Sequence, residues 1–133
     1  MLTELNDTHG TVRIEKDPHG IDQHKPGSKL DAGKPRLGLV LGAFGLALTE
    51  VGKVGTFGAN KYTPNGWLSV PGGQERYTDA MLRHTLQETE GELVDPDSGL
   101  VHAAHTAWNA LARLELMLRE SKRKGVSHGR FPS

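Results

Sequence analysis

The feature that most constrains the fold is the helical spacing of apolar residues in three segments of the chain. In residues 100–119, apolar side chains recur every three or four positions, which places them on one face of a helix. Residues 74–90 and residues 37–54 repeat this spacing. No segment alternates apolar and polar residues convincingly in the strand pattern. We therefore expect an all-α fold, a bundle of three to four helices with long connections.

The helix expected over residues 37–54 is rich in glycine. Each glycine weakens an isolated helix by ~1 kcal/mol relative to alanine. A helix that keeps Gly42, Gly45, Gly52 and Gly55 is therefore expected to pack closely against another backbone.

The chain divides by composition into three parts. Residues 1–28 are polar and rich in Gly, Pro, His and Asp, which predicts an irregular N-terminal arm. Residues 29–120 hold the helical patterns and form the expected domain. Residues 121–133 are basic and then bear glycine and proline, which predicts a flexible tail. A chain of 133 residues buries only a modest core, so subunit association would help it.

Composition excludes several classes of protein. Sixteen Lys and Arg balance sixteen Asp and Glu, which argues against a stable nucleic-acid partner. The absence of cysteine excludes disulfides and thiolate zinc sites and leaves oxygen and imidazole ligands, which suit Mg²⁺ or Mn²⁺. No apolar run reaches the ~18–20 residues of a membrane span, and the N-terminus does not resemble a signal peptide. We expect a cytoplasmic protein, in the host cytoplasm if a phage encodes it.

Three polar residues of the last helix share one face. His102, His105 and Asn109 are three and four positions apart. Two imidazoles and an amide on one face could hold a phosphate, a sugar or a metal ion. A solvated or capping stripe near the start of the helix is an equally good interpretation of the spacing.

Acidic residues gather around the end of the second helix. Asp79 and Arg83 are four positions apart, and Glu92 precedes Asp95 by three. Carboxylates this close repel one another unless a cation lies between them. An exposed acidic surface is the alternative, and the spacing by itself favours that alternative.

The first helix and the arm add further charged candidates. Glu50 lies in an apolar stretch, so it is either a metal ligand or the ion-pair partner of Lys53 or Lys61. Lys34 and Arg36 lie at the end of the segment of residues 29–36, which contains Gly33. This segment could fold over a polyphosphate, or it could be a flexible basic linker. The Walker A spacing is absent, as are H-E-x-x-H, G-x-S-x-G and any His-Asp dipeptide.

Taken in order, the motifs resemble those of one enzyme family. The series is Asp31-x-Gly33-Lys34-Pro35-Arg36; Glu50-x-x-Lys53; Lys61-Tyr62; Asn65-x-Trp67; Asp79-Ala80-x-Leu82-Arg83-His84; Gly91-Glu92-x-x-Asp95-Pro96-Asp97-Ser98-Gly99; and His102-x-x-His105 with Asn109. It resembles the phage-type dATP/dGTP diphosphohydrolases, a branch of the MazG-like and HisE-like all-α pyrophosphohydrolases. The resemblance covers about residues 29–118.

The resemblance implies a MazG-like helical bundle that forms a homodimer or homotetramer, with two or three Mg²⁺ or Mn²⁺ ions per site. The chain departs from the superfamily pattern, because Glu50-x-x-Lys53 stands for E-x-x-E and His102-x-x-His105 for E-x-x-D. The implied metal ligands are Glu50, Asp79, Glu92 and Asp95. The implied catalytic residues are Glu50, Lys53, His84, His102 and His105. The implied substrate-binding residues are Lys34, Arg36, Lys61, Tyr62, Trp67, Arg83 and Asn109.

The function implied is hydrolysis of a purine (deoxy)nucleoside triphosphate, most of all dGTP and with it GTP, to the monophosphate and pyrophosphate in phage nucleotide metabolism. Replacement of Glu50 by alanine is then expected to abolish turnover. Two other functions stay open. The loss of superfamily acids suits a non-catalytic nucleotide-binding or regulatory protein. The basic run Lys122-Arg123-Lys124 suits a small interaction module that touches nucleic acid.

Overall fold

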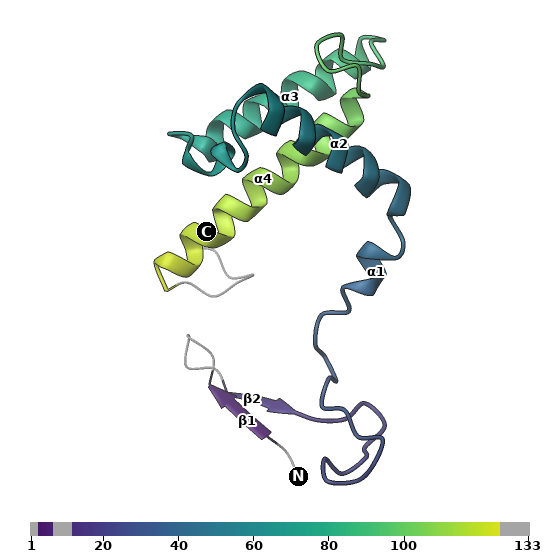
Figure 1. Cartoon of the computed structure of the whole chain (residues 1–133). Coiled ribbons are helices and arrows are strands. Elements are labelled where there is room, and N and C mark those ends of the chain that lie inside the picture. The colour runs from purple at the N-terminus through teal and green to yellow at the C-terminus, as the bar shows by residue number, and fades with distance from the viewer. Residues whose placement is uncertain (1–2, 7–11, 126–133) are drawn as a thin grey trace. The chain divides into compact units, whose positions relative to one another are not determined.

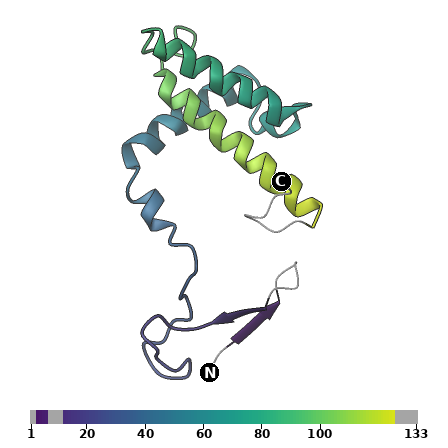
Figure 2. The ribbon, with the colours of Figure 1, turned by 180° about the vertical axis from the view of Figure 1, so that it is seen from behind.

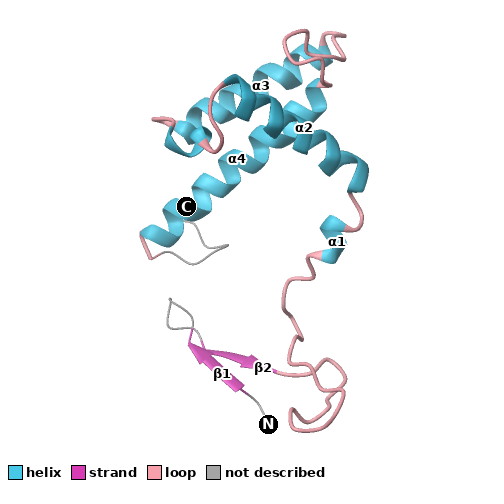
Figure 3. Cartoon of the chain, viewed as in Figure 1, coloured by secondary structure: helices cyan, strands magenta, loops and turns pink. Residues whose placement is uncertain are grey.

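The computed structural model describes residues 3–6 and 12–125 of the chain, shown in Figure 1. The chain divides into two units, one of residues 1–37 and 121–133 and the other of residues 38–120. The described residues are mostly helical, as Figure 3 shows, and the expected all-α fold is confirmed. The helices are α1 (Gly38–Leu41), α2 (Gly45–Lys61), the 3₁₀ helix η1 (Gly66–Ser69), α3 (Gly73–Thr89) and α4 (His102–Arg123).

The single helix expected over residues 37–54 is wrong, because the chain breaks it between α1 and α2. The break falls at residues 42–44, which begin with Gly42 and precede Gly45, and glycine has a low helix propensity. A Cβ atom at Gly42 would lie 2.8 Å from the carbonyl oxygen of Gly38, so this local geometry requires glycine. The expected close approach occurs at Gly55, where an added Cβ would lie 3.4 Å from Nε1 of Trp108. A Cβ atom added at Gly45, Gly52 or Gly58 would have no heavy atom of another part of the chain within 4 Å.

The arm is not wholly irregular, which corrects a second expectation. Strands β1 (Thr3–Asn6) and β2 (Val12–Glu15) pair antiparallel, with Thr3 opposite Glu15 and Asn6 opposite Val12. Val12–Glu15 alternates apolar and polar residues, but Thr3–Asn6 does not, so the pattern indicates no second strand to pair with the first. Residues 126–133, most of the tail expected to be flexible, lie outside the described residues.

Asp17 organises the rest of the arm. Its carboxylate accepts hydrogen bonds from the backbone N–H groups of His19, Ile21 and Lys29. These bonds, led by the one from Lys29, lower the pKa of Asp17 from its usual value. One buried carboxylate therefore fixes the course of a segment of more than ten residues.

In the second unit, α3 lies antiparallel beside the first part of α4 (Figures 1 and 2). Nε of Arg113 donates to Oγ1 of Thr78 at 2.8 Å, and the hydroxyls of Thr85 and Thr106 lie 3.3 Å apart. α2 crosses α4, with Gly55 next to Trp108. No helix of the described part of the chain is long and apolar enough to cross a membrane.

The buried residues of this unit are unusual in kind. Among the described residues, the buried hydrophobic side chains are small or of medium size: Val54, Ala104 and Ala112. His102, His105 and Asn109 of α4 are buried with them, at 0%, 6% and 6% exposure. The face of α4 that carries the polar motif therefore points into the bundle, and the interpretation as a solvated stripe is wrong.

Candidate functional site

A cavity of about 1080 Å³ lies between α2, the connection that contains η1, α3 and α4. We call it the main cavity. It gathers nine of the residues predicted from the sequence, although those residues come from segments far apart in the chain. These are Lys61, Tyr62, Trp67, Asp79, Arg83, His84, Asp95, His105 and Asn109.

Two imidazoles from neighbouring helices stack at the wall of the main cavity. The rings of His84 on α3 and His105 on α4 lie 4.4 Å apart between centroids and only 9° from parallel. Burial lowers the pKa of both imidazoles, and for His84 the neighbouring His105 lowers it further. Both rings are therefore uncharged near neutral pH, so each has one ring nitrogen that can accept a hydrogen bond or a proton.

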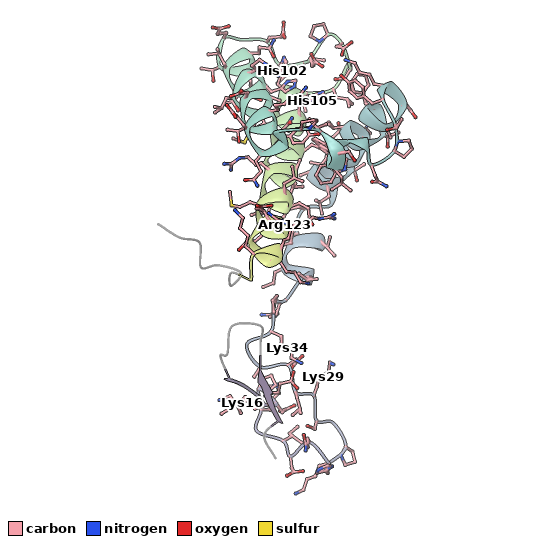
Figure 4. The ribbon with its side chains drawn as sticks, turned by 90° about the vertical axis from the view of Figure 1, so that its left-hand side faces the viewer. Lys16, Lys29, Lys34, His102, His105 and Arg123 are labelled. Atoms are coloured by element: carbon pink, nitrogen blue, oxygen red, sulfur yellow. The ribbon has the colours of Figure 1, made fainter. Side chains whose placement is uncertain are left out.

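The connection between α3 and α4 places Asp95 against His105. Residues 93–102 form a narrow turn, in which N–H of Asp95 donates to the carbonyl of Leu100 and N–H of His102 donates to that of Leu93. Figure 4 shows His102 and His105 at the end of α4 that follows this turn. The turn brings Asp95 within 3.5 Å of Nε2 of His105.

Ser98 connects these two groups. Its hydroxyl donates to Oδ2 of Asp95 at 3.0 Å and lies 2.6 Å from Nε2 of His105. Because the serine proton goes to Asp95, Nε2 of His105 must be the donor in the second bond. Burial alone would raise the pKa of Asp95, but hydrogen bonds from Ser98 and from N–H of Asp97 outweigh it and lower the pKa. Asp95 is therefore a carboxylate near neutral pH.

His102 does not line the main cavity but contacts a residue that does. Its Nδ1 lies 2.8 Å from Nδ1 of His84, and its Nε2 lies 2.7 Å from Oε1 of Glu92. Both nitrogens of this fully buried ring are thus satisfied. His102 and Glu92 therefore contact the main cavity only through His84.

Charged side chains of both signs line the main cavity. Nζ of Lys61 donates to Oδ2 of Asp97 at 2.7 Å, and this bond raises the pKa of Lys61. Arg76, Asp79 and Arg83 line the cavity from α3. The Lys61–Asp97 pair is partly exposed, so a stronger anion can compete for the lysine.

Aromatic rings line another part of the main cavity. The rings of Trp67, Tyr77 and Trp108 meet edge to face, with centroids 5.6 to 6.2 Å apart. The hydroxyl of Tyr77 donates to the carbonyl of Trp67, which fixes the connection that carries this tryptophan. Tyr62 is exposed beside the ammonium of Lys61. Asn109 is held by its amide, which donates to the carbonyl of His105.

Besides His102 and Glu92, two sequence candidates of the second unit, Glu50 and Lys53, do not line the main cavity. Glu50 pairs with Lys53 one turn along α2 at 2.6 Å, which was the alternative interpretation of Glu50. Lys34 and Arg36 belong to the other unit, in which Nζ of Lys34, labelled in Figure 4, lies 2.7 Å from Oε1 of Glu15.

Sequence reasoning missed other residues of the site. Arg76 had no motif to mark it, and Tyr77 and Trp108 had the spacing of core residues. Asp97 and Ser98 looked like turn residues, and the Asp-Pro-Asp-Ser-Gly run was the signal that could have revealed them.

The described residues include no group of three or more His, Asp or Glu side chains placed to hold a metal ion. Asp79, Asp95 and Asp97 nevertheless supply oxygen ligands to the main cavity. Mg²⁺ is usually held by one or two carboxylates, several waters and the phosphates of a substrate. The carboxylates present therefore fit a cation whose coordination a phosphate ligand completes.

The main cavity combines cations that can bind phosphates with aromatic rings on which a base can stack, so its groups suit a nucleotide. Comparison with known proteins agrees. A family model described as "dATP/dGTP diphosphohydrolase, N-terminal" matches residues 24–125, and the chain belongs to this family. No solved structure matches the chain.

A protein of Salmonella phage PMBT28, described as a dATP/dGTP diphosphohydrolase, is 37% identical to the chain over 81 residues. The match covers 61% of this chain and 26% of the phage protein. The chain therefore spans about a quarter of the length of that relative.

The link between Ser98 and Asp95 can be tested by titration. Replacement Ser98→Ala removes the hydroxyl that donates to Asp95 but keeps the backbone N–H, so the pKa of Asp95 is expected to rise. Carboxyl ¹³C NMR titration measures it, with Asp17 as a carboxylate that should not change. An unchanged Asp95 pKa would show that the hydroxyl does not stabilise the charged carboxylate.

Proposed function

We propose that the protein is a metal-dependent hydrolase that cleaves a purine (deoxy)nucleoside triphosphate to the monophosphate and pyrophosphate. The observation that carries this proposal is the composition of the main cavity, where Asp79, Asp95, Lys61, Arg83, His84 and His105 meet beside aromatic rings. Membership of the dATP/dGTP diphosphohydrolase family supports the reaction class.

The charge of the main cavity supports a requirement for metal. Among the described residues that line it, three carboxylates balance three side-chain cations. A triphosphate carries about four negative charges, so it would enter without compensation unless roughly two divalent cations came with it. We propose Mg²⁺ or Mn²⁺ and assign Asp79 and Asp95 as protein ligands. When bound, the cations would offset the phosphate charge and increase the acidity of water in the site.

The polar and aromatic parts of the main cavity suit the two ends of a nucleotide. Lys61, Arg76 and Arg83 would bind the phosphates, and Lys61 would exchange Asp97 for a phosphate oxygen. Trp67 or Tyr62 would stack on the purine, and Asn109 would contact the sugar or base.

The reaction forms one bond and breaks another at the α-phosphorus. A water oxygen bonds to that phosphorus while the bond to the bridging oxygen of the β-phosphate breaks, and pyrophosphate leaves with the bonding electron pair. The water proton passes to a base of the site. His84 and His105 suit this role because burial keeps them uncharged.

The preferred base rests on likeness within the family. The chain resembles MazZ, the phage enzyme linked to replacing adenine by 2-aminoadenine in DNA. dGTP, with GTP, is therefore our proposed substrate. We place the reaction in phage nucleotide metabolism, in the cytoplasm of the host.

Incubation of the protein with each (d)NTP and Mg²⁺ or Mn²⁺ tests the proposal. Release of pyrophosphate and dGMP from dGTP is expected, and chelation of the metal should abolish it. Asp79→Asn should lower kcat about 100-fold or more, because it removes the charge of a carboxylate that we assign as a metal ligand. Glu75→Gln, an exposed acid on the same helix outside the cavity, is the matched control. Metal-dependent binding of dGTP without pyrophosphate release would favour the non-catalytic nucleotide-binding protein instead.

The assay also tests Glu50. The sequence predicts that Glu50→Ala abolishes turnover, whereas its carboxylate pairs with Lys53 outside the lining of the main cavity. Full activity of a folded Glu50→Ala variant would remove Glu50 from the site.

We also propose that the chain forms a homodimer or homotetramer. Large apolar side chains of the second unit are exposed. Such exposure is characteristic of a surface that a partner covers. The exposed set includes Leu46, Leu82, Leu86, Leu111 and Leu114.

Light scattering should therefore give the mass of a dimer or tetramer, and Tm should rise with protein concentration. Leu46→Glu should shift the mass towards the monomer, because it places a charge on a side chain that is 91% exposed within the chain. A monomer at all concentrations would contradict this proposal.

A further inference from the structure

We propose that Glu92 and His102 are positioning residues that hold His84 in the tautomer with a proton on Nδ1, so that Nε2 of His84 is the proton acceptor facing the substrate. This inference deepens the proposed function and rests on it for the identity of the substrate. The sequence predicted His84 and His102 as catalytic residues and Glu92 as a metal ligand. The inference instead gives His84 the contact with the attacking water and lets His102 and Glu92 act through His84.

The chain of hydrogen bonds begins at Glu92. Its Oε1 lies 2.7 Å from Nε2 of His102, and a carboxylate can only accept. Nε2 of His102 must therefore carry a proton and donate it. The bond is sheltered at one end, since the side chain of His102 is 0% exposed while that of Glu92 is 48% exposed.

The direction of the next bond follows from the first. We assign His102 this proton alone, because its other nitrogen faces an imidazole that can donate rather than a second carboxylate, and Nδ1 then has a lone pair. Nδ1 of His84 lies 2.8 Å away, so it must donate to His102. His84 then carries its own proton on Nδ1, and its Nε2 is left with a lone pair.

The other ring nitrogen of His84, Nε2, is the one available to a ligand in the main cavity. His84 lines this cavity, whereas His102 and Glu92 do not. Because Nδ1 is engaged with His102, Nε2 is the ring nitrogen left for a ligand. In the reaction, Nε2 takes one proton from the attacking water while the water oxygen bonds to the α-phosphorus and pyrophosphate departs. In the resulting imidazolium, Nδ1 of His84 keeps its proton and still donates it to Nδ1 of His102.

His105 provides a comparison within the same wall of the cavity. Its proton is on Nε2, which donates to Ser98, and Ser98 donates to Asp95. The two stacked imidazoles are therefore fixed by separate chains of hydrogen bonds. A change at Glu92 should alter the tautomer of His84 and leave that of His105 unchanged.

Ring nitrogens of histidine can be assigned by long-range ¹H–¹⁵N NMR, which distinguishes a protonated nitrogen from one with a lone pair. In the ligand-free protein at about pH 8, where free imidazole is neutral, we expect His84 to be protonated on Nδ1 and His102 on Nε2. Glu92→Ala should convert His84 to a mixture of tautomers, with His105 as the internal control. Glu88→Ala removes an exposed acid from the end of α3 and should change none of them. We chose Glu92 because His102→Ala would empty a fully buried position.

Kinetics give the second measurement. Glu92→Ala should lower kcat for dGTP by roughly 10- to 100-fold, as loss of a supporting hydrogen bond does at other sites, with KM nearly unchanged. Glu88→Ala should keep wild-type kcat.

Two results would overturn the inference. One is a wild-type His84 protonated on Nε2, as it would be if His102 carried two protons. The other is an altered His84 tautomer in Glu92→Ala with full kcat. If the wild-type protein hydrolyses no nucleotide, the proposed function fails, and the NMR measurement still decides the state of His84.

Discussion

The complete burial of His102 is the constraint on which the rest of the site depends. A buried imidazole must satisfy both ring nitrogens, and here one partner comes from α3 and the other from the connection that follows it. The pair of bonds ties α3, this connection and the start of α4 together. His105, three residues further along α4, is then brought into the wall of the main cavity against His84.

The same connection gives the site its second supported imidazole. Asp95, Ser98 and His105 form a chain within one narrow turn, and Asp95 stays charged because hydrogen bonds outweigh its burial. The main cavity thus combines neutral bases with a balanced set of fixed charges. A site of this kind suits the anion of a nucleotide, in agreement with the family to which the chain belongs.

Much of the site could be predicted from the sequence, because the motifs are short and lie on regular elements. Helical spacing put His102, His105 and Asn109 on one face, and the structure adds that this face is buried. Burial could not be read from spacing, since it depends on α3 packing beside α4. For Glu50 the sequence left a metal ligand and an ion pair open, and the structure shows the pair with Lys53, which depends on side-chain reach along α2. The pairing of β1 with β2 was missed because only β2 alternates apolar and polar residues, while Thr3–Asn6 shows no such pattern.

The most direct test of the account is a crystal structure with dGTP whose α,β-bridging oxygen is replaced by a methylene group, grown with Mg²⁺. We predict the triphosphate beside Lys61 and Arg83, cations on Asp79 and Asp95, and Nε2 of His84 on the side of the α-phosphorus. An analogue bound outside the main cavity, or a triphosphate remote from these carboxylates, would contradict the account.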